Sequence, residues 1–368
     1  MTTPMEDLSA LRDAIRRPLA LPYHPLYRFY EGGSMTRAFR GLEPGADDWW
    51  SEDWVGSCTL AGNADPEGHA QGLSRVTVEG LGERSLLSII EALPDQMVGA
   101  AFAERWGPIM GVLVKLLSPA GQVPLHAHPT RAWAAEHLGS RFGKTEAWIL
   151  LDTPGDGSEP AYAGIGFRED VDRGAFVDAV RRRDTGAVRD SLHRMPIAAG
   201  EVYVAHGGVP HYLGPRVSFI EVQEPSDHLV IPEWADADDA GATMGLGFDT
   251  ALGMLDFAAT SREATLGRAR QRPEVRRMTA GGTETGLLDA ETRGYFDATR
   301  LDVTGELEVA DGRFSIAIVT SGDGSLKGDF GHVPLARGMT FALPAALNLR
   351  FVAGTEPLSV VRTMGPAA

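Results

Sequence analysis

Hydrophobic and polar positions alternate along this chain in short runs that Gly and Pro residues separate. Many of the runs are rich in β-branched residues and repeat with a period of two, which predicts β-strands. The predicted strands cover residues 74–81, 110–119, 146–153, 200–208, 217–225, 314–324, 339–346 and 358–364. Short strands with turn residues between them are typical of sheets that form barrels or sandwiches.

Segments with helical periodicity interrupt the predicted strands. The pattern predicts helices over 85–99 and 129–143, a helical pair over 169–195 and a longer helix over 250–270. Asp170 or Asp172 is a candidate N-cap of the helical pair, because an aspartate side chain accepts hydrogen bonds from the free N–H groups of a first turn. We expect these helices to be inserted into, and set between, the β regions.

Two stretches of the sequence resemble each other. Residues 200–211 (GEVYVAHGGVPH) and 338–349 (GMTFALPAALNL) are each a strand pattern that begins at Gly and ends in a tight turn. His211 of the first stretch corresponds to Leu349 of the second. An internal repeat of this kind suggests two related β-barrels, of which only the first keeps the polar residue.

Composition restricts the partners that we expect. The 34 Lys and Arg residues face 50 Asp and Glu residues, so the net charge of -16 repels nucleic acid over most of the surface. No run of about 18 apolar residues predicts a membrane span. The N-terminus lacks a secretory signal pattern, and Cys58 is the single cysteine, which fits a reducing cytoplasm.

Lysine is scarce in this sequence. The three lysines are Lys115, Lys144 and Lys327, while every other basic residue of the 34 is Arg. A compact ammonium group is not equivalent to a planar guanidinium group. Lys115 and Lys144 are therefore candidates for a specific role, because they flank the stretch that carries most of the histidine chemistry.

That stretch contains a candidate metal site. His126 and His128 are two residues apart, so on a strand they point to one face. A structural histidine pair is the commoner explanation of this spacing alone. Glu146 at the start of a predicted strand and His211 at a strand–turn corner extend the pair to three His and one Glu, a set that suits Zn, Mn, Fe or Ni.

The order of motifs supports a specific family. VLVKLLSP, LHAHP, AAEHL, GKTEAW, GEVYVAHGGVPH and IEVQEPSD follow one another along the chain. Together they resemble the cupin superfamily and, over roughly residues 24–365, the type I mannose-6-phosphate isomerase family. The resemblance implies a mainly β fold with inserted helices: two cupin (jelly-roll) β-barrels plus a helical segment. The expected domains are an N-terminal extension (1–23), a metal-binding barrel with helical insertions (24–235), a helical connecting segment (236–294) and a second barrel without metal ligands (295–368).

The resemblance also implies site residues. The zinc ligands of the family fall on His126, His128, Glu146 and His211, with Zn²⁺ as the expected ion and Mn²⁺ or Fe²⁺ as alternatives. Three positions depart from the family pattern: His126 replaces a Gln, His206 replaces a Pro, and Ile231 stands where the family has an Arg after Ser-Asp. Arg216 and Arg362 are candidates to replace that Arg.

The implied reaction is aldose–ketose isomerisation, of mannose 6-phosphate or a related sugar, by proton transfer through a cis-enediol. The candidate catalytic residues are Lys144, Glu221, Lys115 and Asp227. The base could be Glu221, Lys144 or His206, since burial beside a metal tunes a pKa toward neutrality.

Two other functions remain open from the sequence. A metal-binding cupin can be an oxygenase or a decarboxylase, and the Ile231 departure is compatible with a non-catalytic sugar-binding cupin. We expect a small-molecule sugar or sugar phosphate as partner, no nucleic acid, no membrane, and a monomer or homodimer in the cytoplasm.

Overall fold

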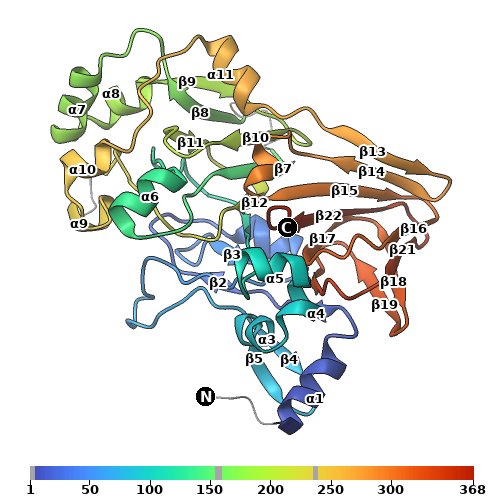
Figure 1. Ribbon diagram of the computed structural model, residues 1–368. Coiled ribbons are helices and arrows are strands. Elements are labelled where there is room, and N and C mark those ends of the chain that lie inside the picture. The colour runs from blue at the N-terminus through green and yellow to red at the C-terminus, as the bar shows by residue number, and fades with distance from the viewer. Residues whose placement is uncertain (1–4, 154–159, 235–238) are drawn as a thin grey trace.

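The computed structural model describes residues 5–153, 160–234 and 239–368. Figure 1 shows two groups of β-sheets that lie against each other, with helices around the first group. The prediction of a mainly β fold with inserted helices is confirmed. Within the described residues, no helix is long and apolar enough to cross a membrane.

The first β region consists of a six-stranded and a three-stranded sheet. In sheet order, the larger one contains β10 (Val202–Ala205), β7 (Glu146–Asp152), β12 (Ser218–Gln223), β6 (Leu113–Leu117), β3 (Glu52–Trp54) and β2 (Pro25–Leu26). The smaller one contains β11 (His211–Leu213), β8 (Tyr162–Phe167) and β9 (Leu192–Pro196). Trp148 and Phe219 of the larger sheet and Ile165 of the smaller one are buried in one apolar cluster. The two sheets therefore enclose a common interior.

The second β region repeats this plan with a seven-stranded and a four-stranded sheet. The larger one contains β1 (Leu19–Ala20), β20 (Thr340–Leu343), β17 (Ser315–Ser321), β22 (Leu358–Met364), β15 (Asp297–Val303), β14 (Gly282–Gly286) and β13 (Glu274–Thr279). The smaller one contains β16 (Glu306–Val309), β21 (Leu349–Ala353), β18 (Asp323–Gly328) and β19 (Gly331–Ala336). Leu301, Val319 and Phe351 fill the space between them. Because β1 pairs with β20, the N-terminal segment is part of this region.

The two larger sheets pack against each other through their outer faces. Ile220 and Val222 of β12 point away from the first interior and join Ile316 and Val361 of the second region in the largest apolar cluster. Alternation along β12 then turns Glu221 to the opposite face, toward the interior. The second region thus covers the back of the sheet that carries the predicted chemistry.

Most of the predicted helices are present. The structure contains α1 (Met5–Ala14), α2 (Ser34–Phe39), α3 (Leu86–Ala92), α4 (Pro94–Val98), α5 (Ala100–Trp106), α6 (Arg131–Leu138), α7 (Arg173–Arg181), α8 (Thr185–Asp190), α9 (Asp239–Ala242), α10 (Phe248–Leu252), α11 (Arg262–Ala269) and the 3-10 turn η1 (Thr292–Gly294). A small hairpin, β4 (Arg75–Val78) and β5 (Gly82–Ser85), precedes α3. Asp172, and not Asp170, caps α7 by accepting a hydrogen bond from the N–H of Ala175.

Two helix predictions need correction. The single helix expected over 250–270 is wrong: α10 ends at Leu252 and α11 begins only at Arg262, where Ser261 caps a new first turn. The helical pair over 169–195 ends earlier than expected, because residues from Leu192 onward form β9 and pair with β8. The helical periodicity of the sequence was therefore not decisive: a new cap at Ser261 determined the structure in the first case, and pairing with β8 determined it in the second.

The two similar stretches have the same local structure. Gly200 and Gly338, which open them, have φ angles of 84° and 86°. These values lie in the region that side chains with a Cβ rarely adopt, so Gly is needed at both turns. Strands β10 and β20 follow directly, and His211 and Leu349 begin the next strands, β11 and β21.

Candidate metal centre and site cavity

The predicted metal ligands come together in the interior of the first β region. His126 lies opposite His211 in an antiparallel bridge, with the N–H of each donating to the carbonyl of the other at 3.0 and 2.9 Å. The N–H of Ala127 donates to the carbonyl of Val230 on the other side. The His-x-His stretch is therefore an extended segment held at single bridges, and not a full strand, but the alternation still directs both histidines to one face.

Four donor atoms meet there. One ligand atom each from His126, His128, Glu146 and His211 lies within 4.8 Å of all the others. His128, Glu146 and His211 are each 1% exposed. Among the residues that the structure describes, this is the one group of His, Cys, Asp and Glu with such spacing.

The backbone orients the three imidazole rings. Nδ1 of His126, His128 and His211 lies 2.7, 2.8 and 2.9 Å from the carbonyl oxygens of Pro124, His228 and Val209, respectively. A carbonyl oxygen only accepts, so each Nδ1 carries the proton. The lone pair of every Nε2 is then available toward the centre of the cluster, which is the arrangement that metal-binding histidines require.

Electrostatics keep the imidazoles neutral. Burial lowers the pKa of His128 to about 3, and the nearby Lys144 ammonium adds to this effect. Burial, with His211 and His128 close by, also lowers the pKa of His126 well below its ordinary value. Burial alone would raise the pKa of Glu146, but Lys144 and His128 outweigh it and hold that pKa well below the ordinary carboxyl value. Three neutral imidazoles and one carboxylate are a donor set for a divalent cation.

Two atoms of the cluster have no hydrogen bond. Nε2 of His211 and Oε2 of Glu146 are buried without a hydrogen-bonding partner of acceptable geometry. The Lys144 ammonium lies 2.9 Å from Nε2 of His128 and 3.0 Å from Oε2 of Glu146, so it borders two of the four donors. Buried polar atoms without partners are rare in folded proteins. These residues fit a bound metal ion.

The loop before β7 positions Lys144. Its N–H donates to the carbonyl of Pro129 at 2.9 Å. At Gly143, a Cβ atom would lie 2.4 Å from that same oxygen, so the loop can approach the His-x-His segment only because residue 143 is Gly. The sequence Gly-Lys-Thr-Glu therefore places an ammonium and a carboxylate beside the same histidines.

A small cavity of about 30 Å³, which we call the site cavity, opens beside the cluster. Its lining includes His126, Lys144 and Glu146 together with Lys115 and Glu221. Glu221 of β12 lies directly across from Lys115 of β6 and from Trp148 of β7. The Lys115 ammonium is 3.0 Å from a Glu221 oxygen. The sheet register thus brings the predicted catalytic residues Lys115 and Glu221 together from two neighbouring strands.

Three further site-cavity residues escaped the sequence analysis: Arg28, Tyr30 and Glu52. The Lys115 ammonium lies 3.4 Å from Glu52, whose other oxygen accepts a 2.7 Å hydrogen bond from the Tyr30 hydroxyl. Arg28 is 5% exposed and donates two hydrogen bonds to the predicted residue Asp227. These residues come from the first part of the chain, where no motif singled them out; Glu52 within SEDW was the nearest signal, as a charge inside a strand pattern.

The charged side chains shift one another's pKa. Burial would raise the pKa of Glu52, but Arg28 and Lys115 lower it to about 2. Burial would also raise the pKa of Asp227, yet Arg28 and Lys115 hold it well below the ordinary value. Glu221 differs: burial and then the Glu146 carboxylate raise its pKa, against the opposing effect of Lys115. Glu221 is thus the site-cavity carboxylate shifted toward neutral pH.

Other candidate residues lie elsewhere. His206 lines a separate hollow with Phe167 and Arg268. Ile231, at the position of the family Arg, is buried in an apolar cluster with Trp234 and does not line the site cavity. Arg362 of the second β region pairs with Asp311, and Arg216 is not part of the site-cavity lining either.

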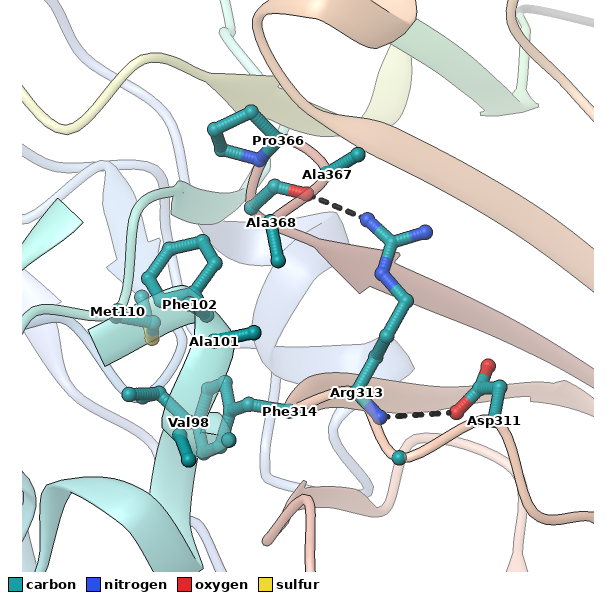
Figure 2. Close-up of a pocket in the computed structure, with 14 residues that line it drawn as sticks. Val98, Ala101, Phe102, Met110, Asp311, Arg313, Phe314, Pro366, Ala367 and Ala368 are labelled. Carbon is teal, nitrogen blue, oxygen red and sulfur yellow. Dashed lines mark hydrogen bonds between the residues drawn. The ribbon is translucent and has the colours of Figure 1, made fainter. Parts of the chain in front are cut away.

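A larger hollow has no such chemistry. About 390 Å³ in volume, it lies between α4–α5 and the C-terminal residues, and Figure 2 shows its apolar wall of Val98, Phe102 and Met110 facing Arg313. Arg313 donates there to the carbonyl of Gly365. None of the four clustered donors lines this hollow, so the position of the chemistry, and not size, identifies the candidate site.

Comparison with curated proteins bears on the family. No protein-family model matches the chain. The chain is 28% identical over 251 residues to a Bacillus subtilis (strain 168) protein named "Putative mannose-6-phosphate isomerase YvyI", a match that covers 68% of this chain and 73% of the relative. It is 21% identical over 249 residues to the mannose-6-phosphate isomerase of Streptococcus mutans, covering 67% and 72%. The predicted resemblance is confirmed: the chain is similar to proteins named mannose-6-phosphate isomerase.

Solved structures share the fold. The crystal structure of mannose 6-phosphate isomerase from Bacillus subtilis superimposes with a TM-score of 0.72 at 22% identity, over 94% of this chain and 99% of that chain. A mannose 6-phosphate isomerase described as bound with zinc and yttrium gives a TM-score of 0.68 at 14% identity, over 95% and 100%. The likeness spans both β regions and the helices between them.

Proposed function

We propose that this protein is a metal-dependent aldose–ketose isomerase that acts on mannose 6-phosphate or a closely related sugar. The observation that carries the proposal is the cluster of three His donors and one Glu donor, which borders a cavity that Lys144, Lys115 and Glu221 also line. The named relatives support the same reaction. No feature of the described residues favours the oxygenase, decarboxylase or non-catalytic alternatives.

His126, His128, Glu146 and His211 would hold the metal ion. Zn²⁺ is the first choice, because neutral imidazole and carboxylate suit it and because a structural neighbour is described as bound with zinc; Mn²⁺ and Fe²⁺ fit the same donors. When bound, the ion supplies Lewis-acid polarisation of the sugar oxygens at C1 and C2, where negative charge develops in the enediolate.

Glu221 is the proposed base. Isomerisation through a cis-enediol removes a proton from C2 of the aldose and returns it to C1, so one group must accept and then donate the same proton. A carboxylate whose pKa is raised toward neutrality does both at working pH. The adjacent Lys115 ammonium holds this carboxylate in place at 3.0 Å.

Lys144 and Asp227 have supporting roles. Lys144 lies beside two of the proposed ligands and presents its ammonium to the sugar oxygens that gain charge. Asp227 fixes Arg28 through two hydrogen bonds and thereby orders the wall of the site cavity.

Turnover tests the proposal. Purified protein freed of metal and reloaded with Zn²⁺, Mn²⁺ or Fe²⁺ is given mannose 6-phosphate, mannose or lyxose, and the ketose product is followed. Ketose formation that depends on the added metal is the expected result. Full metal binding with no isomerisation of any aldose would overturn it.

Several properties remain proposals. We propose the domain limits at residues 23/24, 235/236 and 294/295 along the chain. The second limit lies within residues 235–238, outside the described residues, and β1, β13 and β14 add strands to the seven-stranded sheet of the second region from beyond its proposed limit. A cytoplasmic location, the absence of a nucleic-acid partner and a monomeric or homodimeric state complete the proposal, on the grounds of composition and charge.

A further inference from the structure

The segments that carry two of the proposed metal ligands are bound by two buried glutamates, Glu224 and Glu233. Each glutamate accepts a hydrogen bond from the residue directly before a ligand, and each pairs with an arginine. We propose that Glu224 and Glu233 are positioning residues that set the geometry of the metal centre. The inference rests on the ligand set of the proposed function, to which it adds the residues that hold two of the ligands in place.

Glu224 holds the start of β7. The N–H of Thr145, directly before the ligand Glu146, donates to Oε2 of Glu224 at 3.1 Å, and the N–H of Glu224 donates to the carbonyl of Thr145 at 3.1 Å. These contacts lie just beyond the strand pairing, whose last pair is Gln223 with Glu146. The carbonyl of Glu224 accepts instead from the N–H of Ser226 at 2.7 Å. The Glu224 side chain therefore supplies the acceptor that its backbone does not offer to Thr145.

Glu233 binds the His-x-His segment with the same pair of contacts. The N–H of Leu125, directly before the ligand His126, donates to Oε2 of Glu233 at 2.9 Å, and the N–H of Glu233 donates to the carbonyl of Leu125 at 3.3 Å. His126 and Ala127 are each held by a single bridge and not by a strand ladder. The Glu233 contacts thus add support directly beside a ligand, in a segment that strand pairing secures at few points.

An arginine pairs with the second oxygen of each carboxylate. Nε of Arg131 donates to Oε1 of Glu224 at 2.5 Å, and Nε of Arg189 donates to Oε1 of Glu233 at 2.6 Å. A buried carboxylate is unfavourable unless it is paired, and hydrogen bonds to charged groups are stronger than neutral ones. Arg131 begins α6 and Arg189 lies in α8, so inserted helices supply both cations.

This arrangement acts on the metal centre because it fixes the backbone of the ligands themselves. A functional site needs its side chains within about 0.5 Å of the productive geometry, which requires support from the residues around it. Here His126 and Glu146, which come from different segments, each receive such support at the preceding residue. Arg131 also lies 4.5 Å from the centre of the Tyr295 ring, so the second β region braces the Glu224 contact.

Metal affinity tests the inference without any sugar. The Kd for Zn²⁺, measured by competition with a chelator, should rise at least tenfold in Glu224→Ala and in Glu233→Ala, on the scale of about 10–100-fold for residues that orient metal ligands. The Co²⁺-loaded alanine variants should also differ from the parent in their visible ligand-field absorption. Glutamine at either position keeps an oxygen for the N–H group and should restore the Kd to within about threefold of the parent. Parental Kd values and Co²⁺ spectra in both alanine variants would overturn the inference.

Glu201 provides the matched control. Its Oε2 accepts a 2.9 Å hydrogen bond from the N–H of Ala198, and its Oε1 pairs with Arg270. It therefore makes the same kinds of contact, but Ala198 does not adjoin a ligand. Glu201→Ala should leave the Zn²⁺ Kd and the Co²⁺ spectrum unchanged. An equal rise of the Kd in Glu201→Ala and Glu224→Ala would overturn the inference, because general destabilisation would then account for both.

Arginine variants keep the test decisive should an alanine variant fail to fold. The side chains of Arg131, Arg189 and Arg270 are partly exposed, so their removal leaves no sealed cavity. Arg131→Met and Arg189→Met should raise the Zn²⁺ Kd about threefold or more, since each carboxylate loses its charged partner, whereas Arg270→Met should not. Equal Kd values in the three variants would overturn the inference.

The binding measurements also separate this inference from the proposed function. A parent protein that binds Zn²⁺ tightly, loses affinity in the alanine variants and isomerises no aldose would refute the isomerase proposal and support the positioning roles. An active isomerase whose Zn²⁺ Kd is the same in the parent and both alanine variants would refute the positioning roles alone.

Discussion

At corresponding positions of two similar strand–turn–strand units, the first β region carries His211 and the second carries Leu349. Both residues are buried, at 1% and 3% exposure. His211 faces the four-donor cluster, while Leu349 packs with Phe351 and Leu326 in the apolar interior of the second region. One architecture thus uses the same strand position for ligand chemistry in one copy and for packing in the other.

The two interiors show what the first region needs in order to hold its site. Buried ionic groups are unfavourable unless each is paired. In the first region Arg28 pairs with Glu52 and Asp227, and Lys115 pairs with Glu52 and Glu221. The second region is largely apolar inside and covers the outer face of the six-stranded sheet. The second region thereby buries the back of the sheet on which a charged interior is built.

The largest expected effect comes from substitutions at the corresponding positions 211 and 349. His211→Ala should lose metal and activity together, with activity falling more than about a hundredfold, since even outer-shell partners of a metal site cost 10- to 100-fold. Metal content by mass spectrometry and turnover measure this. Leu349→Ala is the control: it should cost about 2–5 kcal/mol of unfolding free energy as a core cavity and retain the metal. Full metal occupancy in His211→Ala would refute the ligand assignment.

The next prediction separates catalysis from structure within the first region. Glu221→Gln keeps the shape of the side chain but removes the proposed base, so kcat should fall by about 10²–10⁴-fold while metal content stays unchanged. Steady-state kinetics with metal analysis measure both. Glu308→Gln, at an exposed position in β16 of the second region, should leave kcat unchanged. A Glu221→Gln enzyme with near-parental kcat would transfer the role of base to another residue.

The sequence predicted the features that depend on residues close together in the chain. Period-two alternation placed Glu221 and Lys115 on strands, and the spacing of His126 and His128 put them on one face; these are local properties of a backbone. The order of motifs then indicated that Glu146 belongs with them. The mainly β fold and the meeting of the four donors were accessible for this reason.

Long-range partners were not accessible in this way. Arg28 and Asp227 are 199 residues apart, and neither alternation nor a motif links them. Residues from Leu192 onward had helical periodicity, yet they form β9 and pair with β8. The Ser261 cap likewise begins a separate helix where the periodicity predicted a continuous one. Arg28 and Glu52, the charged partners that the sequence analysis missed, come from the first part of the chain and reach the site only through the fold.

Those counterions lead to a stability prediction. Lys115→Met should destabilise the protein by about 3–5 kcal/mol, because it leaves Glu221 as a buried carboxylate without its cation and Glu52 with Arg28 as its remaining cation. Urea unfolding at pH 7 measures the change. Lys327→Met, at an exposed position of the second region, should change stability by less than about 0.5 kcal/mol. Similar losses in both variants would show that the first interior does not depend on charge pairing.

The smallest expected effect is a difference in acid sensitivity between the two regions. Glu52, with a pKa lowered to about 2, and Asp227, with its pKa also lowered, stabilise the folded state above the ordinary carboxyl value of about 4. This contribution is lost as pH falls from about 4 toward 2, on the order of 1–3 kcal/mol per carboxylate. In the second region, burial would raise the pKa of Asp311, but the Arg362 guanidinium outweighs it and lowers that pKa. The Asp311 side chain is 39% exposed, so solvent screens this ion pair.

Spectroscopy can resolve the two regions because all seven tryptophans lie between residues 49 and 234. During acid titration, we expect the tryptophan fluorescence transition at a higher pH than the loss of far-UV circular dichroism, to which both regions contribute. Glu52→Gln should be less stable at pH 7 and should lose less further stability below pH 4, since one titrating carboxylate is gone. Coincident transitions in the parent protein would contradict this prediction. They would mean that the apolar core shared by the two large sheets makes both regions unfold together.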